Sequence, residues 1–169
     1  YLLIPAKYTS GRNAVLLAAS LIFYGWGEPK YILLMLLSIL FNYLLALTIE
    51  NRRIREKRYS IKIILLICVA GNLSILGFFK YTDFLLHTIS QISGSNLGLL
   101  NIALPVGISF YTFQTMSYVI DVYRGTVKAQ RNLLAFALYV SLFPQLIAGP
   151  IVRYRDVEPA LSCRADDTE

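Results

Sequence analysis

The stretch YILLMLLSILFNYLLALTI, residues 31–49, contains nineteen residues and no charged side chain. As a helix it is long enough to cross a hydrocarbon core of about 30 Å. The whole chain of 169 residues is 56% hydrophobic and 15% charged, with a mean hydropathy of +0.57. An ordinary soluble domain carries about 25% charged residues, and intrinsic disorder requires low hydrophobicity. We therefore expect an all-α, polytopic transmembrane helical bundle, formed as one membrane domain over residues 1–169.

Four further segments complete the expected set of membrane spans, which covers residues 13–27, 31–49, 62–80, 103–123 and 132–151. The last segment is broken by Pro144 and by the pair Gly149–Pro150. Broken helices at membrane depth occur where protein or a cavity surrounds them. This segment is therefore either kinked or re-entrant, and the sequence leaves both alternatives open. We read the chain as a portion of a longer membrane protein.

Small and polar residues inside the spans predict where helices pack on one another. Asn42 lies within the 31–49 stretch and needs a hydrogen-bond partner there. Gly71 and Gly77 in the next span allow close contact with a neighbouring helix. Pro105 is expected in the first turn of the helix over 103–123, where proline is tolerated.

Basic residues lie between the apolar runs and give the chain a net charge of +6. The predicted spans place eleven basic residues on one side of the membrane and only Lys30 and Lys80 on the other before residue 133. The positive-inside rule makes the first side cytoplasmic. The loop at 50–62 alone carries six, either as a plain topology signal or as a patch for anionic lipids. Nothing in the pattern indicates nucleic-acid binding.

The most polar span is LPVGISFYTFQTMSYVIDVY, residues 104–123. Its polar side chains recur every three or four residues, so they share one helix face. Lipid cannot satisfy such groups, which therefore either line a substrate path or form hydrogen bonds to other helices. Asp121 has a third alternative, an ion pair with Arg124. Together with a residue from the broken last segment, the candidate lining residues are Tyr111, Gln114, Ser117, Tyr118, Asp121 and Gln145.

Catalytic and metal-binding motifs are not found in the sequence. His87 is the single histidine, with Asp83 four residues earlier as a candidate orienting partner; a lone histidine at an interface is more often incidental. Cys68 and Cys163 lack the spacing of a zinc site or a disulfide framework. We therefore assign no catalytic residue and no metal site to this chain.

Three longer motifs resemble the bacterial branch of the membrane-bound O-acyltransferase family, in particular the alginate O-acetylation type. They are FYGWGEPKY at 23–31, LPVGISFYTFQTMSYVIDVYRG at 104–125 and FALYVSLFPQLIAGPIVRYRD at 136–156. The resemblance implies a multi-pass inner-membrane enzyme that transfers an acyl group, here acetyl, to hydroxyls of an exported polysaccharide. It implies an activated acyl donor such as acetyl-CoA, no covalently bound cofactor, and periplasmic acetylation partner proteins. The family histidine lies outside this chain, so the chain alone should be inactive.

Two alternatives to O-acetyl transfer remain open. The first is a non-enzymatic transporter or scaffold subunit for polysaccharide export, because polar stripes and broken helices also occur in transporters. The other is D-alanyl transfer to teichoic acid, which a sister branch of the resembled family performs. The 110–125 run is more similar to the alginate-type branch.

Overall fold

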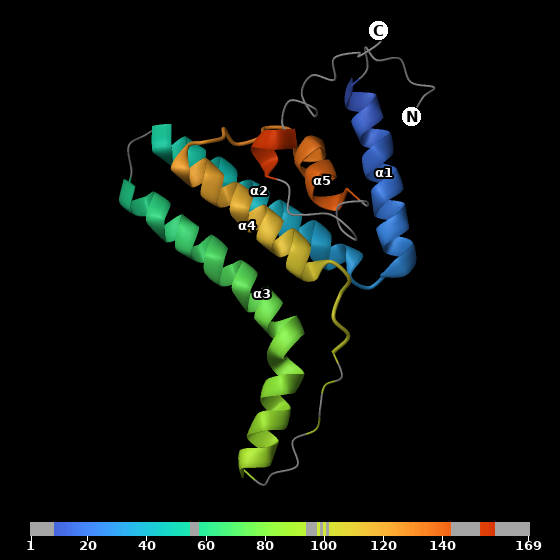
Figure 1. Cartoon of the computed structure of the whole chain (residues 1–169). Coiled ribbons are helices and arrows are strands. Elements are labelled where there is room, and N and C mark those ends of the chain that lie inside the picture. The colour runs from blue at the N-terminus through green and yellow to red at the C-terminus, as the bar shows by residue number, and fades with distance from the viewer. Residues whose placement is uncertain are drawn as a thin grey trace.

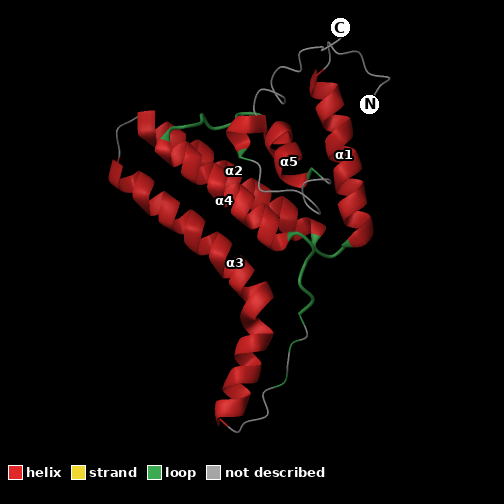
Figure 2. Cartoon of the chain, viewed as in Figure 1, coloured by secondary structure: helices red, strands yellow, loops and turns green. Residues whose placement is uncertain are grey.

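The computed structural model describes residues 9–54, 58–93, 98, 100, 102–142 and 153–157. These residues form five α-helices, and no strand occurs within them (Figures 1 and 2). In chain order the helices are α1 (Thr9–Gly27), α2 (Ile32–Ile54), α3 (Arg58–Ser93), α4 (Ile108–Arg124) and α5 (Leu133–Ser141). The all-α prediction is confirmed for the described part of the chain.

Helix α2 is the centre of the bundle, because it contacts all four other helices. Its buried face includes Met35, Ala46 and Ile49, each with 0% exposure. By length and composition, α2 and α3 are the two helices of the described residues that are apolar enough to cross a membrane. The other three predicted spans correspond to α1, α4 and α5, and membrane crossing by these helices stays a prediction.

Helix α3 is longer than the predicted span at 62–80, since it continues to Ser93. Its 36 residues correspond to about 54 Å at the usual rise. The first half packs on α2 and α4, and the second half extends away from the other helices (Figure 1). Several apolar side chains of this second half are exposed, for example Phe84 and Ile92.

The predicted partner of Asn42 is Asn72 on α3. Each amide donates to the other: Asn42 Nδ2 lies 3.1 Å from Asn72 Oδ1, and Asn72 Nδ2 lies 2.8 Å from Asn42 Oδ1. Both side chains are buried. Gly71, one residue earlier, allows the ring of Phe41 to approach, because a Cβ there would lie 3.0 Å from Phe41 Cζ. The packing prediction is thus confirmed for Gly71 but not for Gly77, whose Cβ position contacts nothing in the structure.

Helix α4 begins at Ile108, five residues after the start of the predicted span. Gly107 adopts a left-handed conformation with φ of 75°, which an α-helix cannot continue. Pro105 therefore lies before the helix rather than in its first turn, which corrects the prediction; its carbonyl accepts from Ile108 N at 3.2 Å. The C-terminal end is a Schellman motif, in which Gly125 N donates to Val122 O and Thr126 N donates to Asp121 O.

Helix α5 has nine residues, far fewer than the predicted segment at 132–151. Asn132 caps its N-terminus by accepting hydrogen bonds from Leu134 N and Ala135 N. The stretch 143–152, with the predicted break, lies outside the described residues. The choice between a kinked and a re-entrant segment therefore stays open.

Candidate functional site

The polar face of α4 points into the bundle rather than away from it. Tyr111 and Tyr118 have 0% exposure and Gln114 has 2%. Gln114 Nε2 donates to the carbonyl of Tyr139 on α5 at 2.9 Å. Tyr118 Oη accepts from Gln130 N at 2.7 Å. In the structure, Gln114 and Tyr118 therefore connect α4 to α5 and to the connection between them.

Tyr111 differs from its neighbours on this face. Its hydroxyl is buried and has no hydrogen-bond partner among the described residues. A buried hydroxyl without a partner costs about 1–3 kcal/mol, so most such groups in native proteins are satisfied. Tyr111 is therefore the candidate whose polar atom is still available to another group, such as a substrate or a further part of the protein.

The three remaining candidates lie in different surroundings. Ser117 is half-buried, and its hydroxyl donates to the Gln114 carbonyl of its own helix at 2.8 Å. Asp121 is half-buried and Arg124 exposed, and within the described residues they do not form the ion pair that their spacing allows. Gln145 lies outside the described residues. A substrate-lining role for any of the six residues stays a prediction.

An aromatic cluster surrounds Tyr118 and joins elements that are distant in sequence. The Tyr118 ring lies 4.7 Å from Phe136 and 4.9 Å from Tyr154, measured between ring centroids. Tyr139 stacks edge-on against Tyr154 at 5.1 Å. Tyr43 of α2 lies 5.9 Å from Phe136. Sequence reasoning missed this cluster because its rings come from four separate segments and only Tyr118 belongs to the polar stripe.

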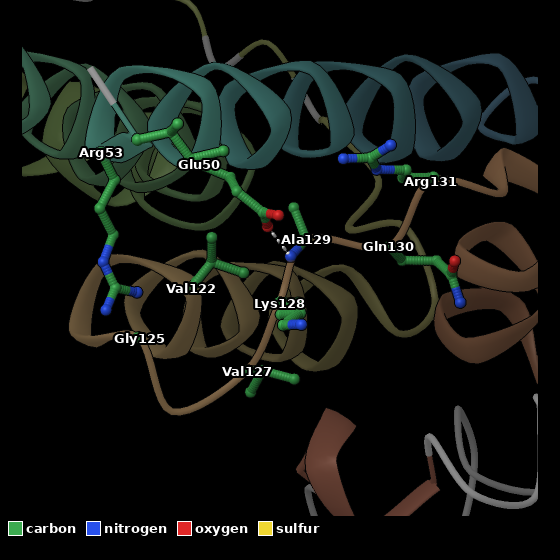
Figure 3. A pocket seen from close by; sticks show the side chains of 10 residues that line it. Glu50, Arg53, Val122, Gly125, Val127, Lys128, Ala129, Gln130 and Arg131 are labelled. Carbon is green, nitrogen blue, oxygen red and sulfur yellow. Dashed lines mark hydrogen bonds between the residues drawn. The ribbon is translucent and has the colours of Figure 1, made fainter.

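The connection between α4 and α5, residues 125–132, is fastened to α2. The carboxylate of Glu50 accepts a hydrogen bond from Ala129 N, as the dashed line in Figure 3 shows. Tyr43 Oη donates to the carbonyl of Arg131 at 2.6 Å. Gln130 Nε2 donates to Tyr154 Oη at 2.8 Å. The contacts of Glu50 and Tyr43 fix the connection against α2, and the Gln130 contact joins it to Tyr154.

An open pocket of about 870 Å³ lies between α2 and this connection (Figure 3). It is at the end of α2 that the charge pattern predicts to be cytoplasmic. Its charged lining residues are Glu50, Arg53, Lys128 and Arg131. Figure 3 shows Glu50 and Arg53 reaching from α2 toward α4 and the connection. Sequence reasoning found the basic loop but not this pocket, because its walls are about seventy-five residues apart.

His87 and Asp83 do not form a catalytic pair. Asp83 accepts hydrogen bonds from Leu100 N and Ile102 N, both at 2.9 Å, and so holds the chain that follows α3. His87 is exposed on the half of α3 that extends away from the bundle. The interpretation of His87 as incidental therefore agrees with its position.

Comparison with known proteins finds relatives whose names describe related activities. The chain is 42% identical over 161 residues to a protein named probable alginate O-acetylase from Azotobacter vinelandii, a match that covers 93% of this chain and 31% of the relative. It is 36% identical over 168 residues to a peptidoglycan O-acetyltransferase from Helicobacter pylori, covering 85% of this chain and 31% of the relative. The chain is 29% identical over 117 residues to a teichoic acid D-alanyltransferase from Lacticaseibacillus rhamnosus, a match that covers 69% of this chain and 26% of the relative.

The chain thus spans about a third of the length of the first two of these relatives. No family model and no solved structure matches it. All three named relatives transfer an acyl group to an envelope or exported polymer, by their names. The identity over about nine-tenths of the chain, together with the all-α fold and its apolar helices, shows that the chain is similar to part of the membrane-bound O-acyltransferases of the alginate O-acetylation type.

Proposed function

We propose that this chain forms part of a membrane enzyme that transfers an acyl group, most simply acetyl, to hydroxyls of an exported polysaccharide such as alginate. The observation that supports the proposal best is the 42% identity, over 93% of the chain, to a protein named alginate O-acetylase. Two helices that are long and apolar enough for a bilayer agree with a membrane enzyme. The proposed location is the bacterial inner membrane, with several crossings.

In this proposal the chain builds one wall of the acyl-transfer site and does not supply the catalytic base. His87 is exposed and its neighbour Asp83 is engaged elsewhere, so we do not assign the base to His87. The family resemblance implies a histidine outside this chain as the base. The polar face of α4 contributes a buried hydroxyl, that of Tyr111, which can donate to an oxygen of the donor or the acceptor. A donor such as acetyl-CoA enters from the cytoplasm, and periplasmic partner proteins receive or use the acetyl group.

The two alternative functions make different predictions for the same cells. A transporter or scaffold subunit would affect how much polysaccharide is exported, and no observation on the structure favours it. D-alanyl transfer is supported by the similarity to the teichoic acid D-alanyltransferase, at 29% identity. It would leave D-alanine rather than acetate on the exported polymer.

The test is a deletion of the gene, followed by complementation with the full-length protein. Acetate released from the exported polysaccharide by mild base is measured together with the mass of polymer exported and with any released D-alanine. We expect the deletion to remove ester-linked acetate while export continues, and complementation to restore it. Unchanged acetate with blocked export would overturn the proposal in favour of transport, and loss of D-alanine in favour of the sister activity.

A further inference from the structure

Positive charge exceeds negative charge in the pocket between the C-terminal half of α2 and the α4–α5 connection. Arg53, Lys128 and Arg131 line it, and Glu50 is its one acidic lining residue. The Glu50 carboxylate already accepts a hydrogen bond from Ala129 N. The ion pair between Arg155 and Asp156 lies elsewhere. Three cations therefore share one pocket with a single carboxylate, that of Glu50, so the pocket lining carries an excess of positive charge.

The position of Arg53 depends on a glycine. Gly125 has a φ of 76°, and the guanidinium of Arg53 occupies the place that a Cβ at this residue would take. The guanidinium therefore covers the C-terminal end of α4, where a cation is favourable because of the helix dipole. A contribution to the stability of the fold is thus sufficient to explain why an arginine stands at position 53.

The same explanation does not apply to Lys128 and Arg131. Both are exposed, and neither side chain has a hydrogen-bond or ion-pair partner within the described residues. Lys128 lies inside the connection, and Arg131 directly precedes the N-cap of α5, an end at which the helix dipole does not favour a cation. The connection that carries them is nevertheless fixed, by Glu50 and by Tyr43, so their Cα atoms are held at the pocket. A fixed backbone that presents unpaired cations to an open pocket is suited to bind an anion.

We propose that this pocket binds a phosphate group, with Arg53, Lys128 and Arg131 as its donors. A guanidinium offers two parallel N–H groups to a phosphate, and a lysine adds a compact charge. The volume of about 870 Å³ is much larger than one phosphate and lies in the range of ordinary ligand pockets. The pocket therefore has room for a larger molecule that carries the phosphate, either the headgroup of an anionic phospholipid or a soluble phosphorylated compound.

The soluble source is tested by titrating the full-length protein, in an uncharged maltoside detergent, with inorganic pyrophosphate in a calorimeter. Lys128→Gln and Arg53→Gln should each weaken binding by about tenfold or more, as expected for one charge-assisted hydrogen bond. Arg52→Gln is the matched control, because Arg52 is the adjacent arginine of α2 and does not line this pocket. Circular dichroism and size-exclusion chromatography establish that each variant is folded.

The lipid source is tested with the same proteins in phosphatidylcholine vesicles that do or do not contain phosphatidylglycerol. Native mass spectrometry then counts the phosphatidylglycerol molecules retained on the protein. Retention that Lys128→Gln abolishes and Arg52→Gln leaves unchanged would support a headgroup as the ligand, whereas saturable pyrophosphate binding with the same pattern would support a soluble ligand.

Two results would overturn the inference. One is that neither pyrophosphate nor phosphatidylglycerol binds the wild-type protein. The other is that Arg52→Gln weakens binding as much as Lys128→Gln, since the attraction would then come from the diffuse charge of the whole region. Neither measurement requires acyl transfer, so the inference can fail while the proposed enzymatic function holds, and the reverse.

Discussion

Tyr111→Phe in the full-length protein should raise its stability. Tyr111 has 0% exposure, and its hydroxyl finds no partner among the described residues. The substitution removes only that oxygen and leaves the ring in place. Because a buried, unsatisfied hydroxyl costs about 1–3 kcal/mol, the free energy of unfolding should rise by a comparable amount.

The matched control is Tyr118→Phe, which removes a hydroxyl from the same inward face of α4. Tyr118 is equally buried, but its hydroxyl accepts a hydrogen bond from Gln130 N at 2.7 Å. Removing this acceptor leaves the amide of Gln130 unsatisfied, so this variant should lose about 1–3 kcal/mol. The two substitutions delete the same atom from the same helix and are expected to shift stability in opposite directions.

The assay is equilibrium unfolding of the full-length protein in mixed micelles, with ester-linked acetate on the polysaccharide measured in parallel. If the Tyr111 hydroxyl serves the substrate, acyl transfer should fall by about two- to tenfold, the equivalent of one neutral hydrogen bond, although stability rises. A loss of stability in Tyr111→Phe would refute the reasoning, because it would mean that the hydroxyl has a partner in the whole protein.

Five further substitutions test the packing of the bundle and the polar face of α4. Asn42→Leu and Asn72→Leu, alone and combined, should show a coupling energy of about 1–2 kcal/mol in a double-mutant cycle, because the two amides bond to each other. Gln114→Leu should allow membrane insertion but lower acyl transfer, as measured by released acetate, since it removes the contact with α5 and a polar group of the α4 face. Gly125→Ala should cost about 1–2 kcal/mol in unfolding, because alanine is strained at a φ of 76°, whereas Gly77→Ala in open space should stabilise α3 slightly.

Each of these expectations has an outcome that contradicts it. Strictly additive effects of the two asparagine substitutions would show that the amide pair contributes nothing. Normal acetate levels in Gln114→Leu would assign Gln114 to helix packing alone. A Gly125→Ala protein as stable as wild type would show that the left-handed end of α4 is not needed.

The parts of the fold that depend on local pattern could be predicted from the sequence. The uncharged run at 31–49 lies within α2 apart from its first residue, and the need of Asn42 for a partner predicted a contact that Asn72 provides. The three- and four-residue spacing on α4 predicted that Tyr111, Gln114 and Tyr118 share an inward face, and these three are buried.

Features that depend on backbone conformation or on distant segments could not be predicted. The left-handed conformation of Gly107 places the start of α4 at Ile108, and the apolar pattern that predicted a span from residue 103 contains no information on this conformation. The pocket lined by Arg53, Lys128 and Arg131 and the aromatic cluster around Tyr118 each join segments that are far apart in the chain, so no local pattern contains them.

The central claim is that the hydroxyl- and amide-bearing face of α4 is turned away from lipid, inside a membrane bundle. Nitroxide labels on single cysteines at positions 114 and 118 of the full-length protein, in vesicles, report collisions with oxygen dissolved in the lipid chains. The account predicts collision rates far below that of a spin-labelled lipid at the same depth. Rates equal to that of the labelled lipid at both positions would contradict it.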